Sequence, residues 1–157
     1  MTPTRLRIDT LDSATNHEIL ARNTLGRLAF SFQDRVDIRP LNYTFRDEWI
    51  FGRTSPGEKL LTVRHHRWVA FQVDEIKDPF DWVSVVAHGP FYLLDAEESQ
   101  KLAELAEEAR TVIREADPQA FTSADATPER TLLFGIAVQE LNGRKGRSEP
   151  LGQESGR

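Results

Sequence analysis

The chain of 157 residues contains no cysteine, and this absence removes several kinds of chemistry at once. It allows no disulfide framework, no thiol nucleophile and no thiolate metal site. The sequence also lacks an apolar signal core near its start, and no apolar run approaches the roughly 18 residues of a membrane span. We therefore expect a soluble, cytoplasmic protein that does not enter a membrane.

An excess of positive charge is missing as well. The formal net charge is −5 at pH 7, whereas non-specific binding of nucleic acid needs a basic face. Cations gather only locally, at residues 64–67 and 144–147, which suits a small anionic ligand better than a polyanion. With 39% hydrophobic and 29% charged residues, and neither repeats nor low-complexity tracts, the composition is that of one globular domain.

The most informative segment that is present covers residues 51–60, FGRTSPGEKL. The order of residues in this segment is typical of a strand that is followed directly by a helix. Ser55 can cap the helix, Pro56 suits the first helical position, and Glu58 completes a capping box with Ser55. The first N–H groups of a helix have no intrahelical partner and lie at the positive end of its dipole.

Two cations and two hydroxyls surround this predicted helix start, namely Arg53, Thr54, Ser55 and Lys59. A phosphate group is the predicted occupant, because charged donors and free N–H groups converge there. The alternative is a capped surface helix whose cations are only solvated.

Hydrophobic periodicity predicts six strands, at residues 28–32, 36–45, 49–53, 69–73, 82–94 and 132–138. Helices are expected over residues 13–22 and 55–65, and behind a second capping box formed by Asp95 and Glu98. Pro40 marks a bend at a sheet edge, and Gly89-Pro90 interrupts the long strand. These elements predict a mainly β fold, an antiparallel β-barrel with flanking helices over residues 1–141, followed by a flexible C-terminal tail, 142–157. A flat α+β sandwich is the alternative.

Five segments, in this order, carry a resemblance to a known family: LGRLAF (25–30), RPLNYTF (39–45), FGRTSPGEKL (51–60), VAFQVDEI (69–76) and SVVAHG (84–89). Together they resemble the pyridoxamine 5′-phosphate oxidase-like superfamily, and within it the small flavin-binding split-barrel proteins that include nitroimidazole reductases. The resemblance implies a six-stranded antiparallel split β-barrel of the FMN-binding type. It also implies a homodimer that holds one FMN in each of two interface clefts.

The resemblance further implies which residues bind the cofactor. The positions that bind the phosphate correspond to Arg53, Thr54 and Lys59, with Ser55 and Leu60 beside them. The strand whose backbone meets the edge of the flavin ring corresponds to Leu41, Asn42 and Tyr43. The strand that borders the ring corresponds to Trp82 and Ser84. The chain departs from the family pattern in two places. Val83 separates Trp82 from Ser84, and His88 stands where arginine is common.

Several of these residues also have plain structural interpretations. Asn42 is either a flavin ligand or a satisfied bulge residue, and Tyr43 and Trp82 fit core or interface positions. His65 and His66 suit the C-terminal end of a helix, where the dipole favours a cation. No catalytic residue and no metal site can be assigned.

The resemblance favours a flavin-dependent oxidoreductase that acts on a small, planar substrate, with nitroaromatic compounds as one candidate class. A cofactor would supply the chemistry that no side-chain pair supplies. One alternative is a protein that binds or stores flavin nucleotide without turnover. Another is a relative on the same fold that binds a deazaflavin or haem.

Overall fold

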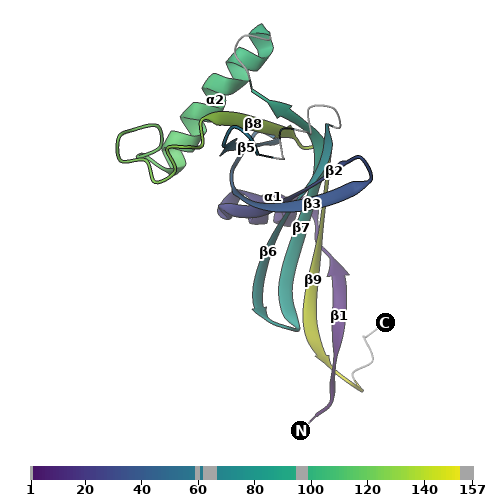
Figure 1. The fold of residues 1–157 in the computed structure, drawn as a ribbon. Helices are drawn as coiled ribbons and strands as arrows, with labels where there is room; N and C mark the ends of the chain where they lie inside the picture. The colour runs from purple at the N-terminus through teal and green to yellow at the C-terminus, as the bar shows by residue number, and fades with distance from the viewer. Residues whose placement is uncertain (1, 59–60, 62–66, 95–98, 153–157) are drawn as a thin grey trace.

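The structure is a computed structural model that describes residues 2–58, 61, 67–94 and 99–152. Within these ranges the chain forms antiparallel strands and two helices (Figure 1). Their order is β1 (Thr4–Thr10), α1 (Ser13–Arg22), β2 (Leu25–Phe32), β3 (Arg35–Asn42), β4 (Thr44–Arg46), β5 (Trp49–Thr54), β6 (Trp68–Asp78), β7 (Asp81–Leu93), α2 (Gln100–Ala116), β8 (Leu132–Ala137) and β9 (Glu140–Pro150). The mainly β, split-barrel fold is confirmed, but the described residues form nine strands instead of six.

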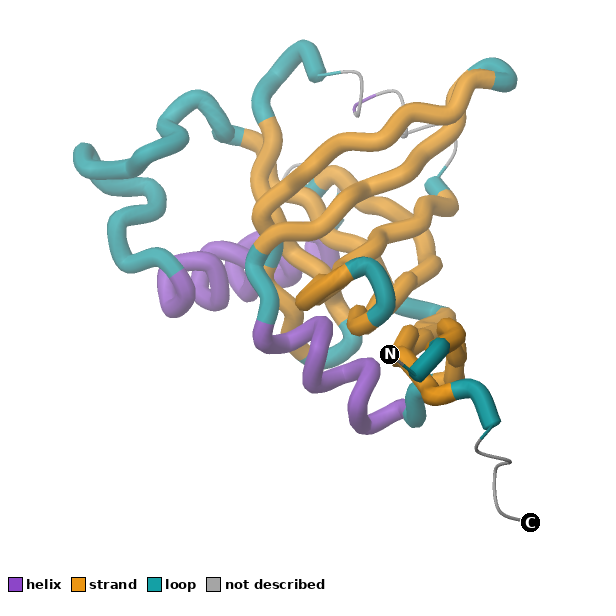
Figure 2. The backbone as a smooth tube through the Cα atoms, turned by 90° about the horizontal axis from the view of Figure 1, so that it is seen from below, coloured by secondary structure: helices purple, strands orange, loops and turns teal. Residues whose placement is uncertain are grey.

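Strand β7 joins the two parts of the sheet. Residues 82–88 pair with β9, and residues 91–93 pair with β8, while β6 covers the other edge. Gly89 lies where the partner changes, and a Cβ atom there would come within 1.8 Å of the carbonyl oxygen of Ala137. The predicted interruption at Gly89-Pro90 is therefore a change of partner within a continuous strand, and the strands curve around a common interior (Figure 2).

Strands β2, β6 and β7 alternate between buried and more exposed residues, whereas β5 and β8 bury consecutive residues because each lies between two cores. In β3 the register passes Pro40 without a shift, and β3 ends the strand order, so the proline lies at an edge as predicted. The strand structure is interrupted instead at Tyr43, the single residue between the end of β3 and the start of β4. The inner face and α1 together bury the main core: Ile19, Leu20, Leu28, Phe30, Tyr43, Ile50, Val69, Phe71, Val73, Val85, Ala87, Phe91, Phe134 and Ile136.

The two helices cover different parts of the sheet. Helix α1 spans the predicted residues 13–22 and is capped by Asp12, whose carboxylate accepts a hydrogen bond from the Thr15 amide. Helix α2 is capped by Ser99, and it forms a second core with residues of β5 and β8. The capping box predicted at Asp95 and Glu98 lies outside the described residues. Neither helix is long and apolar enough to cross a lipid bilayer.

The helix predicted to begin at Ser55 does not begin there. Gly57 has a φ of +86°, which an α-helix cannot contain, and the Glu58 amide donates to the Ser55 carbonyl oxygen at 3.4 Å. Ser55-Pro56-Gly57-Glu58 is thus a turn, with proline at its second position and glycine at its third, the arrangement that a type II turn prefers. Residues 59–60 and 62–66, which include most of the predicted helix, lie outside the described residues.

The flexible tail predicted from Asn142 was also wrong as far as Pro150. Residues 140–150 form β9, which pairs with β7 on one side and with β1 on the other. Strand β1 was not predicted, because its alternation of Leu6 and Ile8 with charged residues is short and its two apolar side chains remain exposed. Both strands extend side by side below α1 (Figure 1).

Truncation tests whether β9 belongs to the fold. A chain ending at residue 141 would lose β9 and leave the β7 edge and β1 unpaired. Its free energy of unfolding should fall by at least about 3 kcal/mol, a large share of the 5–15 kcal/mol typical of a domain, in urea denaturation. A chain ending at Pro150 keeps both ladders and should unfold like the full-length protein. Equal stability of the two truncations would contradict a structural role for β9.

Candidate functional site

The ends of β3 and β5 meet at a cavity of about 220 Å³. Four of the predicted cofactor residues line it together: Leu41, Arg53, Thr54 and Ser55. The remaining lining residues are Arg39, Pro40, Glu58 and Arg130, the last of which lies just before β8. We call this space the arginine cavity. It is formed at the corner where the sequence predicts a phosphate, although a turn and not a helix start forms that corner.

Three arginines line the arginine cavity, Arg39, Arg53 and Arg130. The Nε atom of Arg39 is buried and has no hydrogen-bond partner among the described residues. Its Nη2 lies 3.5 Å from a carboxylate oxygen of Asp37. Three arginines and the hydroxyls of Thr54 and Ser55 line the cavity against a single carboxylate within the described part of the lining, that of Glu58, so the lining favours an anion. The residues present therefore fit a phosphate group.

Arg53 is held in place by the loop of residues 117–131. Its Nη1 and Nη2 donate to the two carboxylate oxygens of Asp125 at 2.7 and 3.2 Å, and Nη2 also donates to the Thr127 hydroxyl at 3.1 Å. The guanidinium lies 4.7 Å from the ring centre of Phe121. Only 10% of the Arg53 side chain and 3% of the Asp125 side chain are exposed. The arginine is thus fixed at the wall of the cavity, and part of its charge is neutralised.

The loop is built to keep Asp125 ionised. The hydrogen bond from Arg53 is the main cause, and the amides of Thr127 and Phe121 also donate to the carboxylate, at 2.9 and 2.8 Å. Together they hold the pKa of Asp125 well below its usual range. The ion pair therefore persists at any pH near neutrality.

Asn42 and Tyr43 line a second cavity of about 360 Å³, which shares Arg53 and Arg130 with the arginine cavity. The Asn42 side chain already has protein partners, because its oxygen accepts from Arg130 at 3.0 Å and its nitrogen donates to the Thr24 carbonyl at 3.4 Å. Tyr43 is buried, and its hydroxyl donates to the Leu20 carbonyl oxygen. Burial raises the pKa of Tyr43, as expected for a core tyrosine.

Trp82 and Ser84 lie away from both cavities, on the outer face of β7. They share that face because they are two residues apart, and the Trp82 ring covers Gly146 of β9. The Ser84 hydroxyl accepts a hydrogen bond from the side-chain Nε2 of Gln72 at 3.0 Å. His88 lies on the same face, with Nδ1 3.9 Å from the Glu140 carboxylate. The fold does not bring these residues to Arg53 within one chain.

Four predicted or discussed residues, Lys59, Leu60, His65 and His66, lie outside the described residues. Conversely, sequence reasoning assigned no role to Arg39, Asp125 or Arg130. Arg39 begins the segment 39–45, which resembles the family, so its place two residues before Leu41 could have indicated a role in the same site. Asp125 and Arg130 reach the site from a polar loop more than seventy positions after Arg53, and no local pattern marks them.

The geometry can be compared with known proteins. Residues 12–145 match the sequence model of a family described as pyridoxamine 5′-phosphate oxidase. Among solved structures, the chain is similar to an FAD-binding protein from Mesorhizobium loti, with 25% identity and a TM-score of 0.69 over 88% of this chain and 97% of that one.

Two further solved structures share the fold. One is an FAD-binding protein from Mycobacterium smegmatis, with 22% identity and a TM-score of 0.66 over 88% of this chain and 100% of that one. The other is a flavocytochrome from Azotobacter vinelandii, with 18% identity and a TM-score of 0.64 over 92% of this chain and 70% of that one. No protein among the curated sequences matches.

The ion pair between Arg53 and Asp125 predicts a particular pH dependence. The pKa of Asp125 is lower in the folded than in the unfolded chain, where it is about 3.9, so the carboxylate stabilises the fold above that pH. This contribution is lost as the pH falls toward the folded pKa. The difference in urea midpoint between wild type and Asp125→Asn should therefore be constant from about pH 5 to 8 and shrink below about pH 4.

The matched control is Glu129→Gln, which changes an exposed acid of the same loop. It should alter the midpoint little across the same pH range. A difference for Asp125→Asn that does not depend on pH would show that the carboxylate charge is not what stabilises the loop.

Proposed function

The chain belongs to the pyridoxamine 5′-phosphate oxidase family, whose sequence model covers residues 12–145, and we propose that it is a flavin-dependent oxidoreductase. The arginine cavity is the observation that carries this proposal. It combines three arginines and two hydroxyl side chains against one carboxylate among the lining residues that the structure describes, that of Glu58, at the corner where the family resemblance puts the cofactor phosphate. A redox cofactor also accounts for the lack of an assignable acid–base pair.

In this proposal the residues of the cavity bind and orient the phosphate. Arg39 and Arg130 supply charge and hydrogen-bond donors, and the hydroxyls of Thr54 and Ser55 lie in the same lining. Arg53 adds a cation whose position is set by Asp125. The flavin, when bound, would accept and donate electrons. Lys59 and Leu60 stay predicted ligands from the sequence motif.

We propose FMN as the nucleotide, on the family resemblance. The similar protein from Mesorhizobium loti is described as FAD-binding, which makes FAD the competing choice. Both nucleotides carry a phosphate on the ribityl chain, so the arginine cavity suits either one. They differ in the second phosphate and the adenosine, and the extracted cofactor distinguishes them by mass.

The proposed site would be completed by a second copy of the chain. The outer face of the sheet exposes large apolar side chains that a monomer would leave in water, among them Leu25, Val36, Ile38 and Ile76. Trp82 and Ser84 lie on this same face. In a homodimer formed through it they would lie at the interface, which reconciles their predicted contact with flavin and their distance from Arg53.

The substrate in this proposal is small and planar, and nitroaromatic compounds are the first class to test. Binding of flavin without turnover is the second candidate function. A deazaflavin or haem on the same fold is a third, and the similarity to a flavocytochrome makes the haem worth testing.

The absorption spectrum of freshly purified protein, with the mass of the extracted ligand, tests the proposal directly. Flavin bands in the near-ultraviolet and blue are expected, with a mass of FMN, and the protein should sediment as a dimer. Anaerobic reduction by a nicotinamide cofactor, followed by reoxidation with a nitroaromatic acceptor, would establish turnover. A Soret band would show haem in place of flavin, and the mass of a deazaflavin would refute FMN as the cofactor. A monomer would refute the proposal that a second copy of the chain completes the site.

Arg130→Gln tests the cavity itself. Loss of one charged hydrogen-bonded contact costs about 1.5–3 kcal/mol, so the dissociation constant of FMN should rise roughly 10- to 100-fold in fluorescence titration. The control is Arg5→Gln, an exposed arginine on β1 that binds Glu149 and lies outside the cavity. Equal FMN affinity of wild type and Arg130→Gln would place the phosphate elsewhere.

A further inference from the structure

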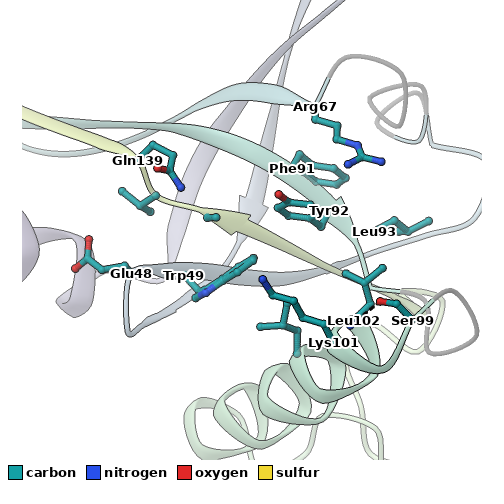
Figure 3. Close-up of a pocket in the computed structure, with 13 residues that line it drawn as sticks. Glu48, Trp49, Arg67, Phe91, Tyr92, Leu93, Ser99, Lys101, Leu102 and Gln139 are labelled. Carbon is teal, nitrogen blue, oxygen red and sulfur yellow. Dashed lines mark hydrogen bonds between the residues drawn. The ribbon is translucent and has the colours of Figure 1, made fainter.

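A larger cavity, of about 650 Å³, lies between the first turns of α2 and the sheet (Figure 3). We call it the α2 cavity. None of its lining residues belongs to the arginine cavity or to the cavity around Asn42, so it is a separate space. Its walls come from β5, β7, the connection between β8 and β9, and α2. The proposed flavin function does not use it.

Aromatic rings form the sheet side of the α2 cavity. Trp49 is stacked on Phe51 with the ring centres 5.8 Å apart and the planes 4° from parallel. The centre of the Tyr92 ring lies 5.8 Å from that of the Trp49 ring, and the two ring planes are inclined by 48°. Phe51 is fully buried beneath them, whereas Trp49 and Tyr92 are partly exposed to the cavity. Rings fixed in this way offer flat apolar surface to a planar ligand at little conformational cost.

Two cations complete the lining. The guanidinium carbon of Arg67 lies 5.8 Å from the centre of the Tyr92 ring. Lys101 also lines the cavity, and Figure 3 shows its side chain pointing from α2 toward the sheet. The one acidic residue among the described lining, Glu48, binds His17, with Oε1 2.6 Å from Nε2. The positive charge near the rings is therefore not neutralised by Glu48.

From this juxtaposition we propose that the α2 cavity binds a small aromatic anion, a planar ring that carries a carboxylate or a similar acidic group. The ring would lie against Trp49 and Tyr92, and the acidic group would reach Lys101 and Arg67. A cation would meet two like charges, and a neutral aliphatic compound would use neither the rings nor the charges. The volume is within the 300–1,000 Å³ typical of small-molecule sites.

Isothermal titration of the full-length protein, as purified with its cofactor, tests this proposal with 2-naphthoate as the probe. Saturable binding with one site per chain is expected. The neutral analogue 2-naphthalenemethanol and the non-aromatic cyclohexanecarboxylate should each bind at least about tenfold more weakly, because each lacks one of the two recognised features. No saturable binding of 2-naphthoate at millimolar concentration, or equal binding of all three compounds, would overturn the proposal.

Substitution of Lys101 locates the binding. Lys101→Met should weaken 2-naphthoate about tenfold and leave 2-naphthalenemethanol unchanged, whereas the control Lys145→Met, at an exposed lysine of β9, should leave both unchanged. Unaltered affinity in Lys101→Met would refute the site.

Arg130→Gln separates this proposal from the flavin proposal. The variant should bind 2-naphthoate like wild type, whether or not it retains flavin, and loss of 2-naphthoate binding there would place the probe in the arginine cavity. Normal binding of the probe to a protein that never contains flavin would support the α2 cavity while contradicting the proposed function.

Discussion

The close packing of Gly89 against the carbonyl of Ala137 is the contact on which the architecture depends. It lets one strand, β7, leave β9 and continue beside β8, so that two sheet portions share a single backbone. Any side chain at residue 89 would separate these backbones, since a Cβ atom would lie 1.8 Å from the oxygen. The two sheet portions that meet at this junction bury the barrel interior and the second core under α2.

The charge of the arginine cavity is set by long-range contacts. Asp125 holds Arg53 in a nearly fully buried pair, and Arg130 reaches Asn42 from the same loop. A buried ion pair gains little net stability over apolar packing, but it fixes geometry, because removing either partner would strand the other charge. In this protein the pair keeps one guanidinium at the wall, while Arg39 retains a buried donor with no described partner. The position of the Arg53 charge is therefore set by the protein itself.

Helix α2 borders two cavities of different character. Its C-terminal residues Ile113 and Ala116 line the space around Asn42, and its N-terminal residues Lys101 and Leu102 line the α2 cavity. The helix packs on the sheet through one apolar stripe that includes Ala106, Ala109 and Val112. Because this packing fixes the helix along its length, the two cavities share a rigid wall without sharing lining residues.

The sequence by itself determined the mainly β class, helix α1 and the inner and outer faces of the strands, because periodicity and caps are local. The family resemblance assigned Leu41, Arg53, Thr54 and Ser55 to one cofactor site, and these four residues line one cavity. Only the tertiary structure decided that β9 is a strand, since a polar, glycine-containing segment becomes ordered by pairing with β7 and β1. The tertiary structure also decided that Asp125 and Arg130 lie near Arg53 and that Trp82 lies on the outer face of β7. Contacts between residues so far apart in the sequence leave no local pattern.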